Sequence, residues 1–226
     1  MRAIELFSGI GGFAAAAADR CEIVAAVDHD EFAHRTYRAN WPHPALRWNV
    51  AGLRAAQLAR LEADLWWMSP PCQPYTVRGA RRDLDDPRAG SLIRLLDLIA
   101  EVRPRHLALE NVPTFAGSRA HEALREVLDR CGYRTRERSL CPAELGMPNK
   151  RPRFYLLASQ DELPAWRAVE RRPVALADFL DAEPDAGLLV PEALLARYAG
   201  ALPVTDLDHP EPQTYCFTSA YGRSPV

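Results

Sequence analysis

The sequence predicts an α/β fold built on an open, doubly wound sheet. Short apolar runs that begin or end next to polar residues are typical of buried parallel strands. Segments with helical spacing of apolar residues lie between these runs, so strand and helix alternate along the chain. The 226 residues are 48% hydrophobic, enough to bury one sizeable core, which excludes a disordered or fibrous protein.

Each expected element follows from its own local pattern. The first apolar run enters a glycine cluster, and the others begin or end next to polar residues. The expected strands, all parallel, are Ala3–Phe7, Ile23–Asp28, Asp64–Met68, His106–Glu110 and Phe154–Ala158. The expected helices are Ala14–Ala18, Asp30–Ala39, Ser91–Val102 and Ala120–Cys131. Ligands bind at the carboxyl ends of the strands in such sheets, so the residues after each run are candidates for chemistry.

The chain is expected to divide near residue 160. Eight of the 19 prolines fall in the last 63 residues, where no clear alternation of strand and helix remains. We therefore expect one domain over residues 1–160. Residues 161–226 are expected to form an appendage or the opening of a second domain.

Charge and cysteine content limit the partners and the compartment. With 28 basic and 30 acidic residues the formal net charge is −2, so any contact with nucleic acid must come from local patches. Five cysteines without a CxxC pair signal neither a disulfide framework nor a zinc site, which fits a reducing, cytoplasmic setting. No run reaches the roughly 18 apolar residues of a membrane span, so no membrane partner is expected.

A glycine turn and an acid suggest an adenosine site after the first two strands. Glycines at a strand-to-helix turn let a ligand approach the backbone, and the Asp28 carboxylate can accept hydrogen bonds from ribose hydroxyls. The spacing of Gly9, Gly11 and Gly12 departs from the dinucleotide pattern GxGxxG, which favours a nucleoside cofactor without a pyrophosphate. A purely structural turn is the alternative.

A cysteine on a proline-rich loop follows the third expected strand. Prolines on both sides of Cys72 keep its thiol out of a regular helix or strand. A free thiol is mostly protonated near neutral pH, so a nucleophile there needs a nearby cation or proton acceptor. Arg78 and Arg88 follow the loop, and Arg151 and Arg153 precede the last strand. An inert buried cysteine is the alternative.

The fourth expected strand ends in Glu110-Asn111-Val112 and brings a carboxylate to the same sheet edge as Cys72. By itself, a solvated strand-end glutamate is the ordinary interpretation. The combination favours a functional site. Consecutive strands carry, in this order, the glycine turn, the aspartate, the cysteine, the glutamate and the arginine pair.

These motifs together resemble the cytosine-5 methyltransferase family, which uses S-adenosylmethionine and has a Rossmann-like methyltransferase sheet. The resemblance covers about residues 1–160. Phe7–Phe13 resembles the cofactor loop, Asp28 the ribose-binding acid, Ser69–Gln73 the catalytic PPCQ loop, Glu110–Val112 the ENV motif and Asn149–Arg153 the QxRxR motif, with Asn149 in place of glutamine. Asn49-Val50 stands where the family has Asp-Ile against the adenine, and an amide can still accept one hydrogen bond from an exocyclic amine.

Within the family, the chain is similar to the transfer-RNA aspartate methyltransferase branch. The similarity rests on Asn40–His43, Pro74–Thr76 and above all Cys216–Thr218, which is followed by Tyr221-Gly222. A Cys-Phe-Thr tripeptide is weak evidence by itself. Its position well after the last core strand makes Cys216–Thr218 stronger evidence for this branch. It implies that residues 161–226 hold part of a target-recognition region.

The resemblance implies a role for each matched residue. The catalytic residues are Cys72, Glu110, Arg151 and Arg153. S-adenosylmethionine, whose product is S-adenosylhomocysteine, is bound by Phe7, Ser8, Gly9, Ile10, Gly11, Gly12, Asp28, His29, Asn49, Val50, Ser69 and Pro70. The nucleic acid is bound by Gln73, Asn111, Arg78, Arg88, Cys216, Phe217 and Thr218. No metal is implied.

These residue types can support the implied reaction. Carbon 5 of cytosine is a poor nucleophile, so the Cys72 thiolate first adds to carbon 6. Glu110 offsets the charge that builds on the ring, and the two arginines orient the base and this carboxylate. The target base has to leave its stack or already lie in a loop, and an anticodon loop meets this condition at lower cost than duplex DNA.

Three functions remain open. The leading one is a tRNA cytosine-5 methyltransferase acting in the anticodon loop, and the second is a DNA cytosine-5 methyltransferase. The third is an inactive nucleic-acid-binding half-protein or one part of a split enzyme, because the chain ends at Val226 before the family's closing Gly-Asn-Ser-type motif and final helix. A fragment is the first explanation of this ending, a second chain that supplies the remainder is the next, and lost activity is the last.

Overall fold

The structure, a computed structural model, describes residues 1–71, 89–168, 170–183, 185–201, 205–209 and 212–215. The chain forms two compact units. The first, the sheet unit, consists of Met1–Ser139 and Arg153–Trp166, and the second unit consists of Leu140–Pro152 and Arg167–Val226. The functional division predicted at residue 160 stays a prediction.

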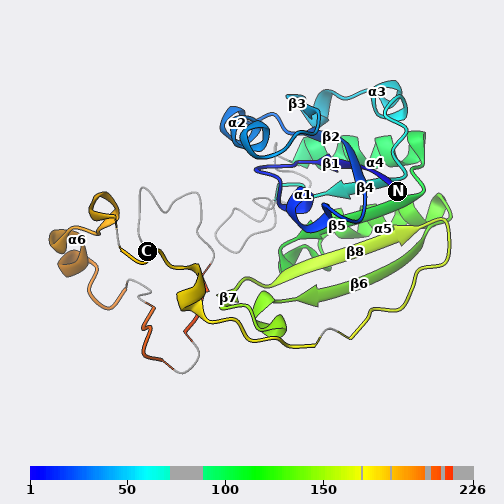
Figure 1. Ribbon diagram of the computed structural model, residues 1–226. Helices are drawn as coiled ribbons and strands as arrows, with labels where there is room; N and C mark the ends of the chain where they lie inside the picture. Colours follow the sequence, from blue (N-terminus) through cyan, green and yellow to red (C-terminus); the bar gives the residue numbers. More distant parts are fainter. Residues whose placement is uncertain (72–88, 169, 184, 202–204, 210–211, 216–226) are drawn as a thin grey trace. The chain divides into compact units, whose positions relative to one another are not determined.

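A seven-stranded sheet organises the sheet unit (Figure 1). Its order is β3-β2-β1-β4-β5-β8-β6. The strands are β1 (Arg2–Leu6), β2 (Glu22–Val27), β3 (Ala45–Leu46), β4 (Leu65–Met68), β5 (His106–Asn111), β6 (Arg134–Leu140) and β8 (Arg153–Ser159). The first five are paired in parallel. The helices are α1 (Gly12–Ala17), α2 (Glu31–Asn40), α3 (Ala55–Ala59), α4 (Gly90–Val102) and α5 (Arg119–Arg130).

Apolar side chains cover both faces of the sheet, which confirms the doubly wound α/β prediction. The larger core joins the strands to α4 and α5, and a smaller cluster joins them to α1 and α2. Local sequence sets the helix starts: the Asp30 carboxylate accepts a hydrogen bond from the Ala33 amide, and the Ser118 hydroxyl accepts one from His121. Within the described residues, no helix combines the length and apolar character needed to cross a membrane.

The direction of the last predicted strand is wrong. Phe154–Ala158 lies within β8, as expected, but β8 pairs with β5 in the antiparallel direction. A strand buried on both faces is an apolar run in either direction, so the sequence pattern could not distinguish the two. The pattern also missed β3, which has two residues, and β6, whose polar sequence RTRERSL lies at the sheet edge.

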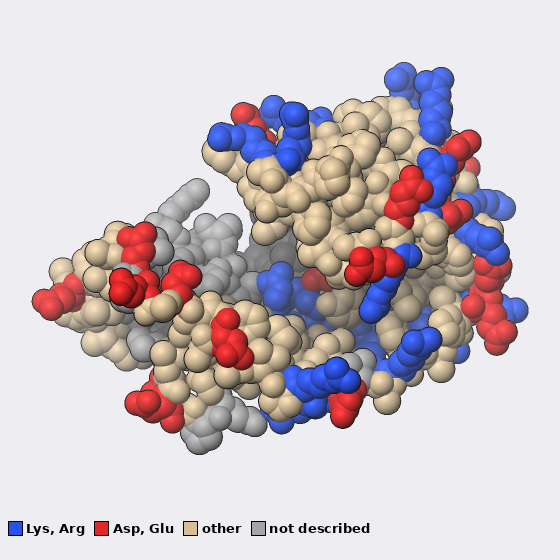
Figure 2. All heavy atoms as spheres, viewed as in Figure 1, with Lys and Arg blue, Asp and Glu red and all other residues tan. Residues whose placement is uncertain are grey.

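The second unit contains a short parallel pair, β7 (Asn149–Lys150) with β9 (Thr214–Tyr215), and the helix α6 (Glu192–Arg197). Figure 2 shows acidic side chains over the part of this unit that contains α6. On the sheet unit, the same view shows basic and acidic side chains interspersed. The prediction that contact with nucleic acid depends on local patches stays a prediction.

Candidate active site

Four parallel strands end level with one another at the edge where the predicted motifs lie. Leu6 of β1 is paired with Val27 of β2 and with Met68 of β4, and Met68 is paired with Leu109 of β5. The chain order reverses between β1 and β4, and such a switch point opens a crevice for a ligand. The sheet therefore brings the residues that follow β1, β2, β4 and β5 to one edge.

The glycine turn after β1 is held by the carboxylate of Asp28. The Gly9 amide donates to Asp28 Oδ2 at 2.8 Å, and the Asp30 amide donates to Oδ1 at 2.9 Å. Each carboxylate oxygen has a second lone pair, so Asp28, with 15% of its side chain exposed, keeps the capacity to accept hydrogen bonds from ribose hydroxyls. Ser8 is buried, whereas Ile10 is 65% exposed.

Gly11 is required by both its backbone and its neighbour. Its φ of +95° lies in the left-handed region that residues with a side chain avoid. A Cβ there would lie 2.2 Å from Nε1 of Trp41, whose indole donates to the Ile10 carbonyl at 3.3 Å. Trp41 belongs to the Asn40–His43 segment, so this part of the sequence supports the turn directly.

We expect Gly11→Ala to lower the free energy of unfolding by at least about 2 kcal/mol. The alanine backbone would be strained at this φ, and the new methyl group would collide with the Trp41 ring. Gly12→Ala is the matched control, because a Cβ at Gly12 would have no atom of the described residues within 4 Å, and Gly12 is the first residue of α1. The control should be neutral or slightly stabilising, by up to about 1 kcal/mol. Urea denaturation without any ligand measures both, and equal stabilities of the two variants would contradict the expectation.

The predicted adenine-side residues are placed differently from one another. Asn49 is exposed, and its Oδ1 accepts a hydrogen bond from the Ala51 amide at 3.0 Å. Val50 is only 3% exposed and packs in the larger core. His29 is exposed, and its Nδ1 lies 3.8 Å from Asp28 Oδ1. Asn49 therefore has its Nδ2 and a second oxygen lone pair available for a ligand.

Asn111 connects the end of β5 to the loop that leads to Cys72. Asn111 is 2% exposed, and its Nδ2 donates to the Pro70 carbonyl at 3.2 Å while its Oδ1 accepts from the Val112 amide at 2.8 Å. On the preceding residue, the Ser69 hydroxyl accepts a hydrogen bond from the Trp67 indole at 3.0 Å. Asn111 thus supports this loop from within, and its predicted contact with the substrate stays a prediction.

Glu110 and Arg153 form an ion pair at the same edge. Arg153 Nε lies 2.7 Å from Glu110 Oε1, and their side chains are 15% and 22% exposed. The antiparallel ladder pairs Asn111 with Phe154, so the first residue of β8 lies beside the end of β5. This charge-assisted hydrogen bond fixes the carboxylate in one orientation while leaving it partly accessible. Arg151 belongs to the second unit.

Several predicted site residues lie outside the described part of the chain. These are Cys72, Gln73, Arg78 and Arg88 after β4, and Cys216, Phe217 and Thr218 after β9. Their predicted roles stay predictions. Pro71 is the last described residue before the first of these segments, and Tyr215 is the last before the second.

Glu5, which is not among the predicted site residues, is a buried acid whose side chain contacts the start of α1 after the glycine turn. Glu5 is 2% exposed, and its Oε1 accepts a hydrogen bond from the Phe13 amide at 3.1 Å. Its Oε2 has no hydrogen-bond partner among the described residues. Burial raises the pKa of Glu5 to about 7, and the nearby Asp28 charge adds to the rise. The signal was present, since Glu5 is the one charged residue within the apolar run Ala3–Phe7.

Comparison with known sequences confirms the predicted family. A model of the family described as C-5 cytosine-specific DNA methylase matches residues 1–187. The tRNA (cytosine(38)-C(5))-methyltransferase of Bos taurus is 38% identical over 164 residues, covering 70% of this chain and 42% of the relative. The protein of the same name from Schizosaccharomyces pombe is 32% identical over 238 residues, covering 98% and 72%. The chain thus spans about two fifths of the bovine relative's length.

Solved structures agree with this result. A methyltransferase of Entamoeba histolytica, EhMeth, has a TM-score of 0.90 at 26% identity and covers 99% of this chain and 72% of its own. The Dnmt2 methyltransferase of S. pombe has a TM-score of 0.82 at 29% identity, covering 98% and 72%. The fold, the order of the motifs and the family match over most of the chain lead to the same conclusion. The chain belongs to the C-5 cytosine-specific DNA methylase family.

Proposed function

We propose that this chain carries the catalytic machinery that transfers a methyl group from S-adenosylmethionine to carbon 5 of a cytosine in tRNA. By analogy with the named relatives, the proposed target is cytosine 38, in the anticodon loop. The observation that carries the proposal is the Glu110–Arg153 ion pair, which lies at the sheet edge beside the loop that Asn111 supports. The proposed location is the cytoplasm, on the cysteine pattern alone.

The glycine turn and Asp28 fit the cofactor. Gly9 has a φ of +53°, and a Cβ there would have no described atom within 4 Å, so the turn is open to a ligand at this position. Asp28 keeps lone pairs for ribose hydroxyls, and Asn49 keeps an amide group for the adenine. When bound, S-adenosylmethionine supplies an electrophilic methyl group and becomes S-adenosylhomocysteine.

In the proposed reaction, the protein makes carbon 5 nucleophilic. The Cys72 thiolate forms a bond to carbon 6, and the electron pair of the 5,6 double bond moves toward carbon 5. Glu110 shares a proton with ring nitrogen 3 and so offsets the negative charge on the ring. Arg153 holds the Glu110 carboxylate, and Arg151 is proposed to orient the base. Carbon 5 would then bond to the methyl group that S-adenosylmethionine supplies, and loss of the carbon 5 proton to a base would restore the double bond and expel Cys72 as its thiolate.

We expect the chain to transfer labelled methyl groups from S-adenosylmethionine to tRNA and not to duplex DNA. An RNA with 5-fluorocytosine at the target position should form an adduct that survives denaturation, because fluorine cannot leave as the carbon 5 proton does. Cys72→Ala should abolish this adduct. Cys131→Ala, at a free cysteine at the end of α5, should retain it and is the matched control.

Each alternative has its own outcome in this experiment. Methyl transfer to DNA alone would favour the DNA methyltransferase, which the name of the matching family makes the second candidate. A correctly folded protein that forms no adduct with either nucleic acid would favour the inactive half-protein. An adduct that persists in Cys72→Ala would assign the nucleophile to another residue.

A further inference from the structure

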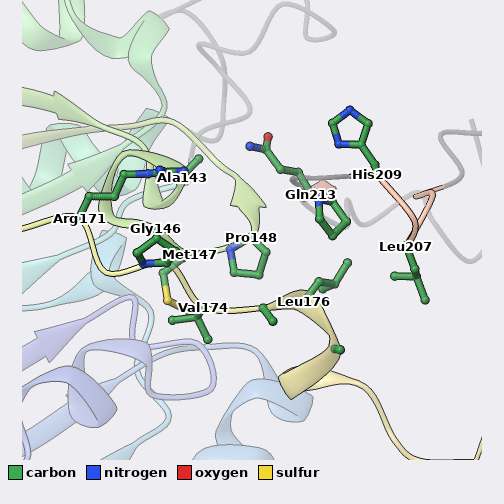
Figure 3. A pocket seen from close by; sticks show the side chains of 14 residues that line it. Ala143, Gly146, Met147, Pro148, Arg171, Val174, Leu176, Leu207, His209 and Gln213 are labelled. Carbon is green, nitrogen blue, oxygen red and sulfur yellow. The ribbon is translucent and has the colours of Figure 1, made fainter.

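The second unit contains a pocket of about 520 Å³, and none of its lining residues belongs to the site described above. Three segments of this unit line it, within residues 143–148, 171–177 and 207–213 (Figure 3). Pockets of roughly 300 to 1,000 Å³ are typical of sites for small ligands or ligand fragments. The volume is therefore sufficient for one flat, ring-sized group.

Main-chain hydrogen bonds hold two of these segments together. The Arg172 amide donates to the Leu145 carbonyl at 3.2 Å, and the Val174 amide donates to the Gly146 carbonyl at 2.9 Å. The approach is so close that a Cβ on Gly146, whose φ is +92°, would lie 2.3 Å from the Arg172 carbonyl oxygen. This part of the pocket wall is thus built by the backbone and does not depend on the ligand for its shape.

The lining combines apolar surface with a few polar groups. Met147 and Leu207 line the pocket and are 37% and 55% exposed, so they contribute accessible apolar surface to it. Figure 3 shows the His209 ring and the Gln213 amide on one side of the pocket and Val174 on the other. An amide offers both a donor and an acceptor to the edge of a base, and an imidazole ring can stack on a base.

Charged groups of both signs lie at or near the pocket. Arg171 is one of the lining residues, and Asp206 and Asp208, which flank the lining residue Leu207 in the chain, are exposed. A nucleobase carries no net charge, and its edge offers both hydrogen-bond donors and acceptors. Surroundings of mixed charge are therefore compatible with a base.

The pocket adjoins, in the sequence, two segments that are predicted to contact the substrate. Pro148 and Gln213 line the pocket and directly precede β7 and β9, which are joined by a hydrogen bond from Asn149 Nδ2 to Thr214 Oγ1 at 2.9 Å. In the sequence, β7 leads into the Arg151–Arg153 motif and β9 leads into Cys216–Thr218. The pocket is therefore built on segments that lead, in the sequence, into residues predicted to contact the substrate.

We propose that this pocket receives a second unpaired base of the RNA substrate, distinct from the cytosine that is methylated. The inference rests on the proposed function, because that function supplies an RNA with several unpaired bases in one loop. The pocket then contributes to the choice of substrate by holding the loop at a second point.

A double-mutant cycle between protein and RNA tests this. The RNAs are an anticodon stem-loop and versions with one abasic position each, at every unpaired nucleotide except the target. Ala177→Trp fills the pocket from an exposed position in a short 3-10 turn, and Ala186→Trp is the matched control in another such turn outside the lining. Gln213→Leu removes the amide with little change in size. Fluorescence anisotropy measures the affinity of the full chain for each RNA.

We expect one abasic position to weaken binding to the wild-type chain about tenfold, the usual size of one stacked base. Ala177→Trp and Gln213→Leu should weaken binding to the intact loop, and Ala177→Trp should lose nothing further with that abasic RNA. Ala186→Trp should bind like the wild-type chain. The inference is overturned if Ala177→Trp binds the intact loop as tightly as Ala186→Trp. It is also overturned if the affinity losses caused by Ala177→Trp and by the abasic position are independent, so that their fold-changes multiply.

Methyl transfer by the same preparation separates this inference from the proposed function. If methyl groups are transferred to RNA but the effects of Ala177→Trp and the abasic position are independent, the inference is overturned and the proposed function stands. If the two effects are coupled but no methyl group is transferred, the pocket is supported and the catalytic proposal is rejected. A chain that binds no RNA overturns both.

Discussion

Glu110→Gln is expected to lower the rate of methyl transfer about 100- to 10,000-fold, the usual contribution of a positioned acid or base. Glutamine has the shape of glutamate but cannot share a proton with ring nitrogen 3, and it replaces the charged partner of Arg153. The 2.7 Å contact between Arg153 and Glu110 would become a neutral–charged hydrogen bond, which is weaker. Single-turnover transfer to tRNA measures the chemical step directly.

Asp161→Asn is the matched control for this change. The Arg105–Asp161 pair has the same 2.7 Å separation, but its side chains are 63% and 48% exposed. Water screens such a pair, so the control should stay within about twofold of wild type. The role assigned to Glu110 would be disproved if Glu110→Gln behaved like Asp161→Asn while both variants gave the wild-type circular dichroism spectrum.

Glu5→Gln is expected to raise the free energy of unfolding by about 1 to 3 kcal/mol at pH 8 and to leave it nearly unchanged at pH 4.5. Burial raises the pKa of Glu5 from 4.5 to about 7. Between these values the folded chain holds a proton that the unfolded chain has lost, so wild-type stability falls as pH rises to about 7 and then becomes constant. Glutamine has no such proton, and its oxygen can still accept from Phe13.

Denaturation in urea from pH 4.5 to 8.5 measures the difference between wild type and Glu5→Gln. Glu62→Gln is the control, because the Glu62 side chain is 76% exposed and its charge is already in water. The control should reproduce the wild-type pH profile. Parallel profiles for Glu5→Gln and wild type would show that Glu5 does not titrate between these pH values.

The sequence predicted most of the sheet and the positions of its motifs, because strand-sized apolar runs and strand-end polar residues are local features. It placed Asp28 and Glu110 at the carboxyl ends of their strands, and the structure has both there. It could not show that Asp28 holds the Gly9 amide or that Asn111 holds Pro70, since these contacts join residues 19 and 41 positions apart. The direction of β8 likewise depends on tertiary neighbours that no local pattern specifies. The burial of Glu5 differs, because one charged residue inside the apolar run Ala3–Phe7 is a local signal.

The antiparallel strand β8 gives the site a form of robustness. Because the β5–β8 ladder pairs Asn111 with Phe154, the ladder itself sets the approach of Arg153 to Glu110. The connecting loops between the two strands can lengthen or shorten during evolution without shifting that register. A charged pair whose members are far apart in the sequence is thus insulated from insertions, and the surrounding loops remain free to diversify.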